Sequence, residues 1–275
     1  MPPTTIAHSL PYINWVVLVT LALGCQAAVV VGRLATSATR GYLAFIAFCA
    51  TGFAALAWLA DGALPPPVGL AIVDAPGLDE PRRLLLGLFA ILALAGLGAA
   101  VVGRGASWLD VAGLGAGVGA AVVATVGWSG GLADGIPAAV ELLILAAATG
   151  GTLAAMVLGH WYLVTPHLSE RPLVLAARLL TGVIAVQVLL FIVWSAAGVG
   201  SGRPFGALIG GAAVFVWLRL LVGLLFPLAL SWMAWQTART RSMESATGLL
   251  YLDLAAVAAG TIVAAGLWLG PGILV

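Results

Sequence analysis

Long apolar stretches, repeated along the whole chain, constrain this sequence more than any other feature. A stretch of about 18 or more apolar residues with few charges is long enough to cross the hydrocarbon core of a membrane. Such stretches lie at roughly 13–32, 42–60, 84–102, 107–128, 138–162, 173–197, 207–235 and 246–268. The sequence therefore predicts an all-α, polytopic bundle of eight transmembrane helices.

The composition leaves no room for a soluble part. Only 8% of the 275 residues are charged and 63% are apolar, whereas soluble domains have about 25% charged residues. We expect one integral membrane domain, residues 1–275, surrounded by lipid. The eleven basic residues are all arginine and face ten acids, so the chain has no basic patch for nucleic acid.

The arginines predict the orientation, because loops retained in the cytoplasm carry the excess of basic residues. Loops on one side hold seven arginines: Arg33, Arg40, Arg104, Arg171, Arg178, Arg239 and Arg241. Loops on the other side hold three arginines and four acids: Arg82, Arg83, Arg203, Asp61, Asp74, Asp79 and Glu80. No basic residue precedes Arg33, so the first span is not read as a cleaved signal peptide. We expect both termini on the non-cytoplasmic side of a bacterial cytoplasmic membrane.

Two pairs of spans are similar in sequence, which points to an internal duplication. Residues 108–117 align with residues 251–260 at an offset of 143, with five of ten positions identical. Gly24, Ala27 and Ala28 of the first span align with Gly151, Ala154 and Ala155 of the fifth at an offset of 127. The pattern predicts two parallel four-helix halves, residues 1–133 and 134–275. Coincidence in Ala- and Gly-rich sequence is the alternative.

Ionisable residues at membrane depth are candidates for function, because each costs at least about 2.5 to 3.5 kcal/mol to insert. Arg219 lies midway along the seventh span and needs an acceptor. Pro227 lacks the N–H that would bond to the carbonyl of Gly223, so that carbonyl is expected to be free one turn from Arg219. We expect an ion pair between Arg219 and Asp253, which either orients two helices or handles a proton or an anion.

Two further carboxylates are predicted near the ends of their spans. Asp110 is three residues into the fourth span and is expected to reach the cytoplasmic interface. Glu141 is expected either to extend towards the non-cytoplasmic interface or to pair with Arg203.

The cytoplasmic end of the fifth span carries His160, Trp161 and Tyr162. A histidine in the last helical turn can pass protons. Aromatic rings beside it suit either a membrane interface or the wall of a ligand site. With Asp110 and Tyr251, which lie at similar depth, these residues form a candidate quinone site.

The sequence disfavours several other chemistries. A haem would need a second ligand near His160, but His8 is on the opposite side and His167 follows a helix-breaking Pro166. No cluster has the spacing of a metal site and no catalytic motif of a soluble enzyme is present, so no catalytic residue is assigned. Cys25 and Cys49 lie at similar depth, and a pair of small buried thiols is favoured over a disulfide.

Three functions remain open. The first is the quinone-interacting membrane subunit of a respiratory or redox complex with other subunits. An eight-helix chain of this kind is similar in topology to the quinone-binding anchors of such complexes. The second is a transporter for a small solute or a lipid-like molecule, with its site between the two halves. The third is a structural anchor or assembly subunit without a site of its own.

Overall fold

The computed structural model describes residues 3–103, 107–165 and 169–275, and side chains from His8 onward. Within these ranges every regular element is a helix, and eight helices are long and apolar enough to cross a membrane, as predicted. The elements are α1 (Pro3–Ala35), α2 (Arg40–Asp61), α3 (Pro76–Val101), α4 (Ser107–Trp128), α5 (Leu132–Val164), α6 (Arg171–Ala197), η1 (Gly206–Leu208), α7 (Ala213–Leu220), η2 (Leu221–Leu225), α8 (Phe226–Arg239) and α9 (Met243–Leu269). Helices α7, η2 and α8 are continuous and form the seventh span.

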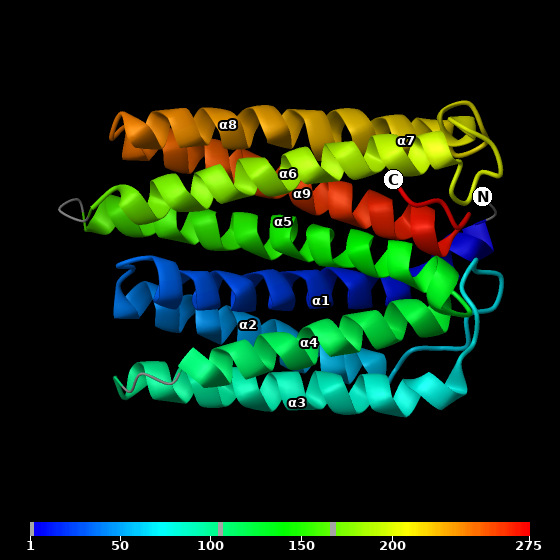
Figure 1. The fold of residues 1–275 in the computed structure, drawn as a ribbon, viewed down its shortest axis with the longest axis horizontal. Helices are drawn as coiled ribbons and strands as arrows, with labels where there is room; N and C mark the ends of the chain where they lie inside the picture. The colour runs from blue at the N-terminus through cyan, green and yellow to red at the C-terminus, as the bar shows by residue number, and fades with distance from the viewer. Residues whose placement is uncertain (1–2, 104–106, 166–168) are drawn as a thin grey trace.

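The spans lie side by side along the long axis of the molecule, and both chain ends lie at the same end of the bundle (Figure 1). We call the other end the arginine-rich end; it carries Arg33, Arg40, Arg171, Arg178, Arg239 and Arg241. Arg104, assigned to the same side, lies outside the described residues. The end with the termini is called the acidic end; it carries Asp61, Asp74, Asp79 and Glu80.

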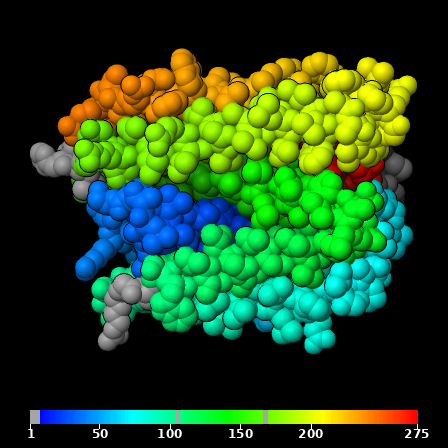
Figure 2. Space-filling view, in the orientation of Figure 1, coloured from blue at the N-terminus to red at the C-terminus, as the bar shows by residue number. Residues whose placement is uncertain are grey.

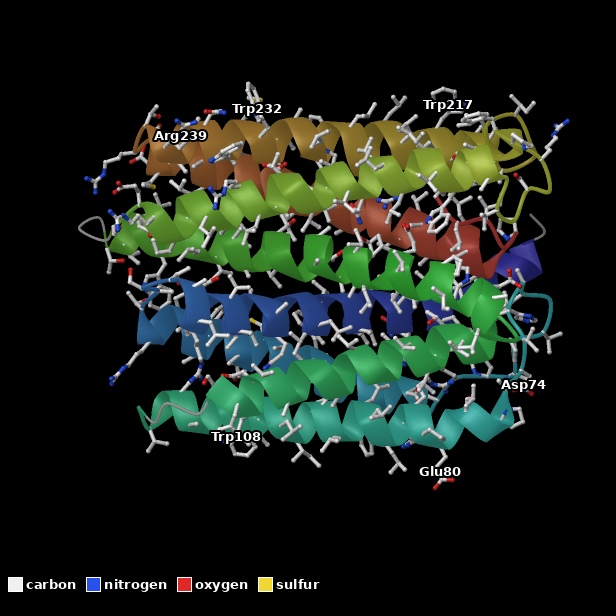
Figure 3. All side chains as sticks on the ribbon, in the orientation of Figure 1. Asp74, Glu80, Trp108, Trp217, Trp232 and Arg239 are labelled. Carbon is white, nitrogen blue, oxygen red and sulfur yellow. The ribbon has the colours of Figure 1, made fainter. Side chains whose placement is uncertain are left out.

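The outside of the bundle is apolar. Large hydrophobic side chains such as Leu94, Ile192 and Val214 are at least half exposed along the spans. Trp108, Trp217 and Trp232 also point outward (Figure 3). An exposed apolar surface of this extent requires a covering, and a lipid bilayer provides it.

Helices α1 and α5 pack against each other at the centre, with α2, α3 and α4 on one side and α6, α8 and α9 on the other (Figure 1). Glycine allows their close approach: a Cβ on Gly24 would lie 2.1 Å from the carbonyl oxygen of Ala146, and one on Gly150 would lie 2.6 Å from the Cα of Gly24. Cys25 lies at this crossing, and both it and Cys49 are free thiols.

The acidic end is closed by a loop and by aromatic side chains. In the loop between α2 and α3, the N–H groups of Ala71 and Val73 donate to the last carbonyls of α9 and α4, at Leu269 and Trp128 (2.9 and 2.8 Å). The Trp128 ring packs on Tyr12, Trp15 and Trp268, with centroids 5.4, 4.7 and 6.0 Å away. This aromatic cluster joins α1, α4 and α9.

Candidate functional site

Arg219 is almost completely buried, with 1% of its surface exposed. Its guanidinium group contacts three oxygen acceptors. Nη2 lies 3.6 Å from a carboxylate oxygen of Glu141 on α5. Nη1 donates to the carbonyl of Gly223 (3.1 Å), and Nε donates to the carbonyl of Val275 (3.3 Å). The charge is therefore held by one carboxylate and two backbone oxygens, as a cation at membrane depth requires.

The Gly223 carbonyl is available for the reason that the sequence predicts. Pro227 donates no hydrogen bond, and the helix widens into the π-helical turn η2, where the N–H of Phe226 bonds to the carbonyl of Leu221, five residues back. Such widened turns often occur at functional positions. The acceptor expected one turn from Arg219 is confirmed.

Arg219 does not pair with Asp253 in the structure. Asp253 is fully buried, and among the described residues neither of its carboxylate oxygens has a hydrogen-bond partner. A buried carboxylate without a partner is costly, so Asp253 is a candidate site for a proton or a cation.

Glu141 takes the place that was expected for Asp253. It neither extends towards the interface nor pairs with Arg203, which were its two expected arrangements. The reason is the start of α5: the helix begins at Leu132 and not near residue 138. Glu141 therefore lies nine residues into the helix, or about 13 Å along its axis. At that depth its carboxylate is buried and faces Arg219.

A second buried ion pair lies in the other group of helices. Asp110 on α4 is 2.9 Å from Nε of Arg33 on α1, and only 1% of its surface is exposed. Gln26 donates to the backbone carbonyl of Asp110 (3.0 Å), and Arg33 also donates to the carbonyl of Gly96 (3.3 Å). Asp110 was expected to extend to the interface. Instead it stays buried inside the bundle, where the side chain of Arg33, near the end of α1, contacts it.

The residues of the candidate quinone site are spread over several places. His160 and Tyr251 lie together at the exposed surface between α5 and α9, with Nδ1 and the phenol oxygen 3.5 Å apart. Tyr162 is buried and donates to the carbonyl of Ser169, while the Trp161 ring covers Gly41 of α2. Asp110 is held by Arg33. His167 and Pro166 lie outside the described residues.

An apolar groove of about 170 Å³ runs between α1, α5 and α6. Its walls are mostly small side chains, among them Gly24, Ala28, Gly151 and Ala155. These four are positions that the sequence repeat aligns in pairs. Thr36, Ala38, Tyr42 and Pro172 line its arginine-rich end. Figure 2 shows the groove as a hollow between α1 (blue) and α6 (yellow-green), with α5 (green) behind it.

A polar cavity of about 440 Å³ at the acidic end was not anticipated. Arg82 is buried there and binds Asp61 (2.6 Å) and Asp79 (2.7 Å), and Trp15 donates to Asp61 (2.9 Å). From the sequence, Asp61, Asp79 and Arg82 are expected only as loop charges. Their positions in the sequence could have predicted the ion pair. Asp61 ends α2 and Arg82 lies in the first turns of α3, so both lie at the same end of one helical hairpin.

Comparison with protein-family models, curated proteins and solved structures finds no match to this chain. The fold itself defines the class: eight apolar spans, an apolar outside and ion pairs turned inward make this a multi-pass helical membrane protein.

Proposed function

We propose that the protein binds and transports a lipid-like molecule through the groove between α1, α5 and α6. The groove is the observation that carries the proposal. Its walls offer an apolar chain a close fit, and none of the described residues that line it is charged. A small polar solute would find few partners along the same path.

The packing of the helices supports a groove between two related halves, residues 1–133 and 134–275. In each half the first helix contacts the second and the last spans, and the second contacts the third: α1 with α2 and α4, α5 with α6 and α9. Across the halves, α1 contacts α9 and α5 contacts α4. This arrangement fits a two-fold axis along the membrane normal, between α1 and α5.

Asp253 and Arg219 would drive such transport. A carboxyl without a partner changes its charge without breaking an ion pair, so Asp253 suits proton coupling. Arg219, which Gly223 holds at the widened turn, suits a hinge or an anion contact.

The role of the groove in transport can be tested by replacing a glycine in its wall with a large side chain. A Cβ on Gly151 would meet no atom within 4 Å, so Gly151→Leu fills the groove without disturbing the backbone. Gly182→Leu is the matched control, because Gly182 also has open space but faces outward on α6. In proteoliposomes, we expect Gly151→Leu to stop the flux of a fluorescent lipid and Gly182→Leu to leave it unchanged. Equal flux in both variants would contradict the proposal.

Proton coupling has its own measurement. Flux that depends on a pH gradient in the wild type should become independent of it in Asp253→Asn, and Arg219→Gln should slow it. Flux indifferent to both substitutions would remove these residues from the mechanism.

A quinone-interacting subunit of a redox complex is the second candidate, and the His160–Tyr251 contact favours it. Both groups can exchange protons, and they lie near the membrane boundary that we propose to be cytoplasmic. Quinone should co-purify with the protein and its partner subunits, and His160→Ala should reduce quinone turnover. Absence of quinone, with unchanged turnover in His160→Ala and Asp110→Asn, would exclude this function.

A further inference from the structure

A second cavity, of about 340 Å³, opens at the arginine-rich end between α6 and α8. Its lining residues are Glu170, Arg171, Val174, Leu175, Arg178 and Arg239. Three arginines and one carboxylate give the lining a net charge of +2 (three minus one). Figure 3 labels Arg239 at this end of α8.

The protein itself makes little use of these arginines. Glu170 pairs with Arg241, outside the cavity lining, at 3.5 Å. Arg239 lies over the Trp235 ring and donates to Gln236. In the described part of the chain, none of the three lining arginines forms an ion pair with a carboxylate. Their guanidinium groups are therefore free to bind an anion from outside.

The cavity adjoins the apolar groove through one side chain. Leu175 lines both, and Pro172, beside Arg171, lines the groove. On α6, Arg171, Leu175 and Arg178 are spaced by four and three residues, so they form one stripe along the helix. A molecule with an anionic head and an apolar chain would meet the arginines and the groove at the same time.

We infer that the ligand of the groove is a lipid whose phosphate headgroup has a net negative charge; its phosphate binds at Arg178 and Arg239 and its chain crosses Leu175 into the groove. This inference rests on the proposed function of the groove. Arginine suits phosphate because its planar guanidinium donates two parallel hydrogen bonds. Free inorganic phosphate would offer the arginines the same anionic oxygens as a lipid headgroup. The apolar groove beside the arginines favours a lipid as the source of the phosphate.

The test is native mass spectrometry of the full chain in detergent, titrated with phosphatidylglycerol or phosphatidylcholine of the same chain length. We expect preference for the anionic phosphatidylglycerol. Arg178→Gln should weaken its binding about five-fold, the effect of one arginine near a membrane surface. Arg40→Gln is the matched control, because it removes the same charge at the same end away from the cavity, and it should leave binding unchanged.

The remaining outcomes separate the inference from the proposed function. Equal binding of both lipids, or equal loss in Arg178→Gln and Arg40→Gln, would overturn the headgroup site; if Gly151→Leu still blocked binding, the groove itself would stand. Displacement of the lipid by millimolar inorganic phosphate would identify a site for free anions and overturn the lipid. Phosphatidylglycerol binding that survives Gly151→Leu would contradict the groove, and with it the inference.

Discussion

Buried ionisable residues in this bundle are in two different situations. Arg219 and Glu141 neutralise each other, and two backbone carbonyls accept hydrogen bonds from the Arg219 guanidinium group. Asp253 is equally buried but has no partner among the described residues. Removing one member of a buried pair leaves an uncompensated charge and costs about 3–5 kcal/mol. An unpaired carboxyl has no such pair to lose.

Glu141→Gln and Asp253→Asn should therefore differ in stability. We expect Glu141→Gln to lower the free energy of unfolding by about 3 kcal/mol, because Arg219 loses its carboxylate. Asp253→Asn should change it by less than about 1 kcal/mol. Equilibrium unfolding in mixed detergent micelles measures both. Equal losses would mean that Asp253 has a partner or that the Arg219 pair contributes nothing.

At the scale of helices, the seam between α1 and α5 depends on two glycines. Gly24 and Gly150 face each other across it, so that either Cβ would collide with backbone atoms of the other helix. Gly151, the next residue on α5, points into open space. Neighbouring positions on one helix thus differ completely in what they tolerate.

Gly150→Ala should destabilise the bundle and Gly151→Ala should not. The first adds a methyl group where there is no room, a change that typically costs about 1–3 kcal/mol. The second also replaces glycine by the better helix former, and so serves as the matched control. Thermal unfolding in detergent compares them. A lower midpoint in Gly151→Ala than in Gly150→Ala would contradict the packing described for this seam.

The sequence predicts the spans well and their contacts poorly. Hydropathy identifies all eight spans because each must be apolar over the thickness of the bilayer. The position of Pro227 predicts the free Gly223 carbonyl too, because a proline acts on the carbonyl four residues back in its own helix. The partner of Arg219 could not be obtained in this way. It depends on where α5 begins and how α5 is rotated, and both are decided by packing between helices.

The whole molecule has two unlike ends. One carries arginines with few acids, and the other carries the Asp61–Arg82–Asp79 cluster, in which Asp61 and Arg82 are buried, together with both termini. We propose that the arginine-rich end faces the cytoplasm, since basic residues are retained there.

Cysteines at the two ends test this orientation. Ser37→Cys lies in the exposed loop between α1 and α2, and Glu80→Cys is exposed at the acidic end. In intact cells, a membrane-impermeant maleimide should label the cysteine at position 80 and not the one at position 37. The two native thiols are a low background, because Cys25 is buried and Cys49 is partly buried within a span. The reverse labelling would invert the topology.

The aromatic cluster around Trp128 also gives the molecule a built-in optical signal. Trp15 and Trp128 come from the first four spans and Trp268 from the last, and their rings are close enough for their excited states to couple. Near-ultraviolet circular dichroism and fluorescence anisotropy from these indoles would follow any motion of one half against the other, without an attached dye. The tryptophans that close the acidic end would thereby report, in the native protein, whether the two halves move during turnover.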